Sequence, residues 1–367
     1  MANWFYKALP HHKLTFELLK AVLWLQAAPR YAVNRVRQSL RVRFSALGAA
    51  ALALASIPQV NAKPVEVAQG SADDLGVMSI QLKDIVKPQV GIQAQTQAAG
   101  TPNQAGLGGF LPLVVGSNSV FFADVLANAN FADINNSSSI INTTVAGTTI
   151  STSSRLGYRW LNGDRSWMYG LNAGYDTRPM STGPSDTGVP VYASRTAFFQ
   201  QAAVNAEAVS EKWRFNAYGL IPTGEEDQQL NSVYKGGALT TVGADAGYSI
   251  TPSLLASLGG YYQNGDLDDD GNPEVDNIGI LGRLAYAINN QLSIGANLSY
   301  DASFDTRFSA DIKWRFNTNG GPGKETPKSN AAVTALTSTP SNRDVRVHDD
   351  SGDLPEFLCD LKGACNF

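Results

Sequence analysis

The sequence predicts an all-β protein, an antiparallel transmembrane β-barrel of about 10–12 strands, from three observations. Ten segments between residues 117 and 316 alternate apolar and polar residues with a period of two, which is typical of strands with two unlike faces. Each segment has about 9 to 12 residues, the length that a tilted strand needs to cross a bilayer. The connections alternate long and short, as in barrels with short turns at one end and long loops at the other.

The two faces of these segments differ in a way that favours a membrane. In the first segment, Phe121 and Val125 share one face with alanines, whereas Asp124 and Asn128 share the other. Across the segments the apolar faces end in Trp, Tyr or Phe, as interfacial girdles do, and the polar faces suit a hydrated lumen. A soluble β-sandwich also alternates. It has no reason to keep the long and short rhythm of connections, so it is the weaker alternative.

The N-terminal residues 1–62 are predicted to be a signal peptide for export. Four arginines between positions 35 and 43 precede an apolar run at 45–57, and Val60-Asn61-Ala62 supplies the small residues of a cleavage site before Lys63. A signal anchor that is never cleaved is the alternative. The leader holds eight of the 28 basic residues and one of the 32 acidic ones, which leaves 20 basic and 31 acidic residues in the exported chain. This acidic balance argues against nucleic acid as a partner.

Two further segments flank the predicted barrel of residues 117–316. Residues 63–116 are rich in Ala, Gln, Gly and Pro and are predicted to be a flexible periplasmic lead-in. Residues 106–115 and 139–152 are the places where two additional strands would fit. Residues 317–367 are predicted to be a Gly-, Pro-, Ser- and Thr-rich linker with a short tail. Fully extended, this linker is long enough to pass through the barrel, and it is equally able to remain in the periplasm.

The charged residues on the polar faces are predicted to line the lumen. They are Arg155, Arg159, Arg214, Arg283, Lys313 and Arg315, with Asp176, Glu207, Asp245 and Asp311 as their candidate partners. Charges inside a barrel must be paired or hydrated, so a structural role is favoured over a selectivity filter. The three histidines, His11, His12 and His348, lie outside the strand region, and no nucleophile or phosphate-loop motif is evident. The sequence therefore predicts neither an enzyme nor an organic cofactor.

One acidic loop has the spacing of a calcium site. Asp266, Asp268, Asp270 and Glu274 offer hard oxygen ligands around Gly271, in a pattern of D-x-D-x-D-G type. A solvated acidic loop without an ion is the alternative. The two cysteines, Cys359 and Cys365, are spaced to close a small loop and are predicted to form a disulfide after export.

The hairpin SSRLGYRWLNGDRSWMYGLNAGYDTRP resembles the β-domain of the inverse autotransporters, the translocators of intimin and invasin. The matching residues are Gly157, Tyr158, Arg159, Gly170, Asn172, Ala173, Tyr175 and Asp176. The resemblance implies a twelve-stranded barrel in the outer membrane, with a periplasmic N-terminus and a C-terminal passenger that passes through the lumen. Because 51 residues follow Phe316, the expected function is to anchor and display a short C-terminal segment.

The alternatives to display are a small porin or channel and a structural protein of the envelope. The expected partners are outer-membrane lipid, the barrel-assembly machinery and a surface ligand that the sequence does not identify.

Overall fold

The computed structural model describes residues 81–131, 149–181, 192–193, 195–232, 234–267, 273–316 and 331–351. The predicted signal peptide, most of the predicted linker and the pair Cys359 and Cys365 lie outside these ranges. Within them, no helix is long and apolar enough to cross a bilayer.

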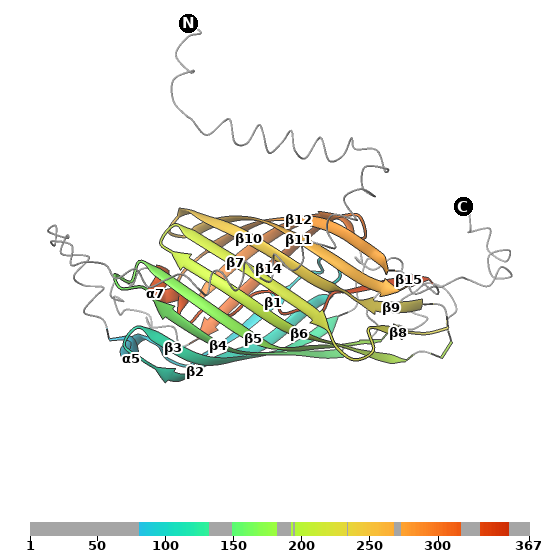
Figure 1. Ribbon diagram of the computed structural model, residues 1–367, viewed down its shortest axis with the longest axis horizontal. Coiled ribbons are helices and arrows are strands. Elements are labelled where there is room, and N and C mark those ends of the chain that lie inside the picture. Colours follow the sequence, from blue (N-terminus) through green and yellow to red (C-terminus); the bar gives the residue numbers. More distant parts are fainter. Residues whose placement is uncertain are drawn as a thin grey trace, which may run out of the picture. The chain divides into compact units, whose positions relative to one another are not determined.

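The described chain is dominated by one closed antiparallel barrel of twelve strands (Figure 1). Its strands are β1 (Gln89–Gln95), β2 (Asn103–Val115), β3 (Ser119–Phe131), β4 (Thr149–Leu161), β5 (Trp167–Ser181), β6 (Thr196–Ser210), β7 (Trp213–Pro222), β10 (Thr240–Thr251), β11 (Leu254–Leu267), β12 (Pro273–Ala287), β13 (Leu292–Asp301) and β14 (Asp305–Phe316). Each strand pairs with its sequence neighbour in the barrel, and β1 pairs with β14 to close it. Closure leaves no strand edge unpaired in the wall, which is what a bilayer demands.

All ten predicted segments are strands of this barrel, and two more strands precede them. One of the two additional places was predicted correctly, since β2 covers residues 106–115. The other was wrong, because residues 149–152 begin β4 and the remaining strand is β1. The predicted lead-in of residues 63–116 is therefore corrected: the barrel begins at Gln89. Val90 and Ile92 alternate with Gly91 and Gln93 in β1, but the strand is short and its glutamines are typical of a linker.

The outer face of the wall is apolar, as predicted. Leu, Ile, Val and Phe side chains point outward from every strand and are exposed. At one end the aromatic side chains form a nearly continuous series of ring contacts, in which Trp213 lies against both Phe215 and Tyr248 and Trp167 stacks on Phe215. Such a girdle marks the level of the lipid headgroups, where an amphipathic ring is most stable.

The two ends of the barrel differ in the length of their connections. We call the end with the turns 162–166, 211–212 and 252–253 the short-turn end, and the opposite end the long-loop end. The long-loop end carries β8 (Asp227–Gln229) and β9 (Tyr234–Ala238), a hairpin within the β7–β10 connection. The connection between β13 and β14 is the short exception at this end, as the sequence indicates.

Large inward side chains fit because a glycine faces them on the next strand. Phe122 pairs in register with Gly157, Tyr218 with Gly243, and Tyr261 with Gly279. A Cβ on Gly279 would overlap the Tyr261 ring, and a Cβ on Gly157 would meet Phe122. The missing side chains let each ring lie flat across the neighbouring strand, which covers the backbone of that strand.

Three smaller elements lie at the ends of the barrel. The helix α5 (Leu82–Ile85) precedes β1, and Leu82 packs into the apolar cluster at the short-turn end. The helix α7 (Ala331–Ala335) contributes Val333 to the same cluster. The strand β15 (Val347–Ser351) pairs with β9 at the long-loop end, so the order of the small sheet is β15-β9-β8.

We expect Gly279→Ala to destabilise the barrel by ~1–3 kcal/mol, because its methyl group must displace the Tyr261 ring from a packed site. Gly260→Ala on the adjacent strand is the matched control, since its Cβ would point outward with no atom closer than 3.7 Å. Urea unfolding in liposomes, followed by the electrophoretic shift between folded and unfolded forms, measures both. Equal stability of the two variants would contradict this account of the glycine.

Candidate functional site in the barrel lumen

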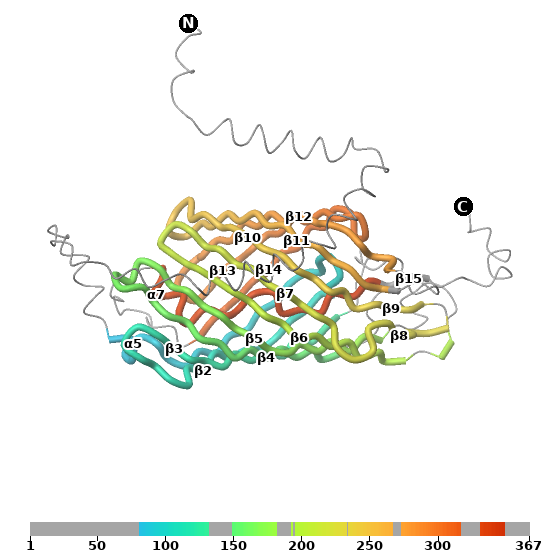
Figure 2. Tube along the Cα trace, in the orientation of Figure 1, coloured from blue at the N-terminus to red at the C-terminus, as the bar shows by residue number. Residues whose placement is uncertain are grey.

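The lumen holds the C-terminal part of the chain. Residues 331–351, which we call the tail segment, run from α7 at the short-turn end to β15 at the long-loop end, as the red trace in Figure 2 shows. Leu336 is buried in the apolar cluster at the short-turn end, with Phe122 and Met168. Val345 and Val347 are buried in a second cluster at the long-loop end. Polar residues lie between these two apolar contacts.

Arginines of the wall bind the backbone of the tail segment. Arg159 donates to the carbonyl oxygens of Leu336 and Ser338 at 3.1 and 2.6 Å. Farther along, the carbonyl oxygen of Asn342 accepts from Arg155 at 3.1 Å, and that of Val345 accepts from Arg178 at 3.0 Å. Arg315 and Gln201 donate to two further tail carbonyls. An extended chain inside a barrel has no helix or sheet to satisfy its carbonyls, so these donors replace a hydrogen-bond ladder.

Carboxylates on neighbouring strands hold these arginines in place. Arg155 and Asp176 form a bidentate ion pair, with N···O distances of 2.5 and 2.8 Å, and both side chains are about 1% exposed. Such a pair fixes the plane of the guanidinium group. The Nη2 group of Arg155 then also donates to the tail, whereas its Nη1 group donates to Ser153 and Ser154 of the wall.

Arg159 uses a carboxylate two strands away. It reaches across β5 to Glu207 on β6, at an Nε···Oε1 distance of 2.7 Å. Gly170 lies between them in register, and a Cβ there would come within 2.6 Å of the Glu207 carboxylate. The guanidinium group of Arg159 also lies 4.5 Å from the centre of the Phe122 ring. The glycine thus makes the ion pair possible.

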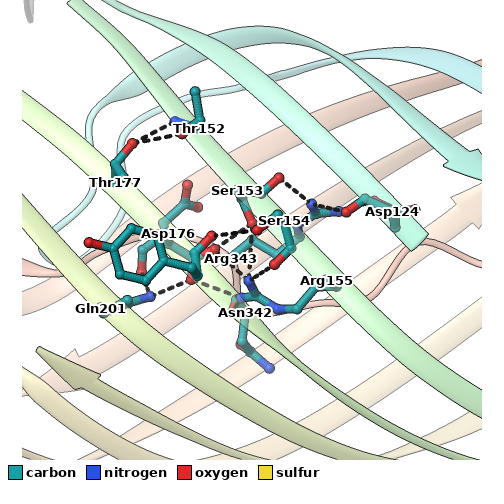
Figure 3. A network of polar contacts seen from close by, with 12 residues as sticks. Asp124, Thr152, Ser153, Ser154, Arg155, Asp176, Thr177, Gln201, Asn342 and Arg343 are labelled. Atoms are coloured by element: carbon teal, nitrogen blue, oxygen red, sulfur yellow. Dashed lines mark hydrogen bonds and ion pairs between the residues drawn. The ribbon is translucent and has the colours of Figure 1, made fainter. Parts of the chain in front are cut away.

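The tail segment contributes one buried arginine of its own. Arg343 forms an ion pair with Asp124 on β3, and its Nε and Nη2 donate to the Oγ and backbone oxygen of Ser153 on β4 (Figure 3). The next residue, Asp344, accepts from Gln95 and Gln104 at 3.1 and 2.9 Å. These side-chain contacts fix which residue of the tail lies at this level of the lumen.

The other predicted lumen charges are arranged in several ways. Arg283 pairs with Asp311 at 2.5 Å, and its side chain remains 28% exposed. Asp245 accepts from the amide of Asn216 at 3.0 Å rather than from an arginine. Among the described residues, no ion pair is formed by Arg214 or Lys313. The sequence predicted these charged residues as lumen charges without assigning their partners, and it did not include Arg343, which lies in the predicted linker.

The residues that carry the family resemblance divide between the two faces of the hairpin. Those on the lumen side are Gly157, Arg159, Gly170, Asn172 and Asp176, and those on the outer side are Tyr158, Ala173 and Tyr175. The amide of Asn172 and that of Asn205, opposite it in register, are both buried without a hydrogen-bond partner among the described residues. Polar groups of this kind are normally satisfied by water.

The predicted calcium loop is described only in part. Asp266 and Glu274 are described, whereas Asp268 and Asp270 lie outside the described ranges, so calcium stays a prediction. His348 has a contact that the sequence does not predict. Its position in the sequence placed it outside the barrel, yet threading of the tail brings its Nδ1 to 2.5 Å from Asp266 at the long-loop mouth.

No family model and no curated protein sequence matches the chain. Several solved structures resemble it. A membrane protein from a study of in-meso crystallization has a TM-score of 0.53 and 10% identity, over 72% of this chain and 100% of that one. An outer-membrane channel from Pseudomonas putida F1 has a TM-score of 0.41 and 13% identity, over 68% and 99%. The KdgM porin has a TM-score of 0.35 and 8% identity, over 62% and 99%.

The chain folds as a closed antiparallel β-barrel of the membrane type. At identities this low, the likeness shows the fold alone. The closed wall, the apolar outer face and the aromatic girdle are the features of a barrel that spans a bilayer, as the sequence predicts.

We expect Asp124→Ala to loosen the tail segment, because the variant leaves the Arg343 guanidinium buried without its carboxylate. Loss of one partner of a buried ion pair costs on the order of 3 kcal/mol. Hydrogen exchange of peptides from residues 331–351 should rise, while the strands of the wall stay protected. In the double variant with Arg343→Ala, the second substitution should add much less than it does alone. Additive effects of the two substitutions would rule out a direct pair.

Proposed function

We propose that this protein is an outer-membrane anchor that carries its own C-terminal segment through the barrel and presents it at the long-loop end. The observation that carries the proposal is the course of the tail segment, which enters the lumen at the short-turn end and leaves at the long-loop end. Long loops of outer-membrane barrels face the exterior and short turns face the periplasm. In this orientation the chain after Ser351 emerges outside the cell.

The contacts inside the lumen support a resident segment. The bonds from Arg155, Arg159 and Arg178 go to backbone oxygens, which every residue offers, so a passing chain of any sequence meets the same donors. The contacts that depend on the side chains of the tail include the ion pair between Arg343 and Asp124 and the hydrogen bonds from Gln95 and Gln104 to Asp344. The backbone contacts would let chains of many sequences pass through the lumen, and the side-chain contacts would hold one segment there. This combination suits a translocator whose linker remains in the lumen after transport. The resemblance to inverse autotransporters implies the same arrangement.

Three kinds of partner follow from this function. Outer-membrane lipid contacts the apolar outer face, and the barrel-assembly machinery inserts the closed wall. The emerging segment meets a surface ligand whose chemistry stays open.

A small channel is the second candidate function. It is favoured by polar groups of the lumen, namely the amides of Asn172 and Asn205, which have no partner among the described residues, and the partly exposed pair of Arg283 with Asp311. Water at these groups would give small solutes a path along the wall. In this case the tail segment narrows a pore, and display of the tail outside the cell is not part of the function.

An epitope tag after Phe367 tests display. We expect antibody to label this tag on intact cells, and external protease to remove it, because the tail leaves the lumen on the outer side. A tag placed after Lys63 is the control, and it should be labelled only after the outer membrane is permeabilised. A C-terminal tag that also requires permeabilisation would refute display.

Conductance in planar bilayers tests the channel. We expect the full chain to conduct weakly, and a chain that ends at Phe316 to conduct several-fold more, because the segment that fills the lumen is gone. Equal and substantial conductance of both chains would favour the channel over the anchor. The electrophoretic shift of folded barrels confirms that the shortened chain has assembled.

A further inference from the structure

Three potential metal ligands meet where the tail segment leaves the lumen. Asp266 lies one residue before the end of β11, Glu274 is the second residue of β12, and His348 lies on β15 of the tail. One ligand atom from each lies within 4.8 Å of the other two. Asp266 and His348 are buried, whereas Glu274 is exposed.

The surroundings hold the imidazole and one carboxylate in place. The His348 ring lies edge-on to Phe304 at 5.6 Å, and its Nδ1 contacts the Asp266 carboxylate at 2.5 Å. Asp266 has a positive φ of 54°, and Gly237 on β9 lies so close that a Cβ there would overlap it. Aspartate tolerates this left-handed conformation better than most other side chains do.

The donor set distinguishes between classes of ion. Calcium prefers six to eight oxygen ligands, whereas one imidazole nitrogen with two carboxylates suits Zn²⁺ and related transition metals. Zinc lies about 2.0–2.2 Å from such ligands, which requires ligand atoms roughly 3–3.5 Å apart. Because the three ligand atoms already lie within 4.8 Å of one another, small side-chain rotations would bring them to that separation. A water molecule would complete the coordination, and the proton between His348 and Asp266 would be released.

We propose that Asp266, Glu274 and His348 bind a divalent transition-metal ion of the Zn²⁺ type, which fastens the emerging tail segment to the β11–β12 hairpin. Two ligands belong to the barrel and one to the tail, so the ion cross-links them. The site is complete only when the tail occupies the lumen. It rests on the threaded arrangement behind the proposed function, and it adds a means of locking the tail after threading.

Zinc titration of the protein isolated from outer membranes tests the site. The background carries Cys359→Ser and Cys365→Ser, because thiolates also bind zinc. We expect one Zn²⁺ per chain, and an affinity at least about tenfold lower in His348→Gln and in Glu274→Gln. Asp276→Asn, an acidic residue of the same hairpin that accepts from Tyr262, is the matched control and should bind normally. With Co²⁺ in place of Zn²⁺, the visible absorption should lose its nitrogen-ligand contribution in His348→Gln.

Hydrogen exchange tests the cross-link itself. Zinc should slow exchange in residues 347–351 of the parent protein and leave it unchanged in Glu274→Gln, whose assembly is checked by the electrophoretic shift of the folded barrel. Absence of zinc binding, binding that ignores His348, or preferential binding of Ca²⁺ would each overturn the site. Display is scored separately by the C-terminal tag on cells treated with a chelator. A hidden tag with intact zinc binding would refute display alone, and an exposed tag without zinc binding would refute the site alone.

Discussion

The structure depends on one constraint: an extended chain inside the barrel must have its carbonyl groups satisfied where no secondary structure can do so. The wall meets this constraint with guanidinium groups, each of which has several donors in a fixed plane. Arg155 and Arg159 each donate both to a carboxylate of the wall, Asp176 or Glu207, and to a carbonyl oxygen of the tail. The buried charges are thereby neutralised, and the tail gains hydrogen bonds that do not depend on its sequence.

The same constraint explains why glycines are placed on the inner face. Gly170 lets Arg159 reach Glu207 across a strand, and Gly157 leaves room for the Phe122 ring on which that arginine lies. Gly157, Arg159 and Gly170, which all carry the family resemblance, are thus parts of one packed group on the lumen side. Aromatic Tyr158 faces outward from the same strand and serves the membrane instead. A single hairpin therefore supports both the lumen and the lipid-facing surface.

The two ends of the lumen divide the work of holding the tail. At the short-turn end, α7 and Leu336 bury apolar surface. This burial stabilises the tail there but does not fix its register, because the hydrophobic effect is non-directional. In the middle, Arg343 and Asp344 fix the register through charged contacts. At the long-loop end, β15 adds a third strand to the β8–β9 hairpin, and main-chain pairing of this kind continues an exposed edge with little regard to sequence.

The sequence by itself determined the strands, their faces and the alternation of turns and loops, because a period of two and a bilayer length are local properties of the chain. It also placed Arg155, Arg159, Asp176 and Glu207 among the charges of the lumen. It did not assign which of them pair, and Arg159 and Glu207 lie two strands apart. It missed β1, whose seven residues have the composition of a linker. Only the tertiary structure decided that the tail occupies the lumen. Arg343 lies 219 residues from Asp124, and His348 lies 82 from Asp266, so no local pattern records either contact.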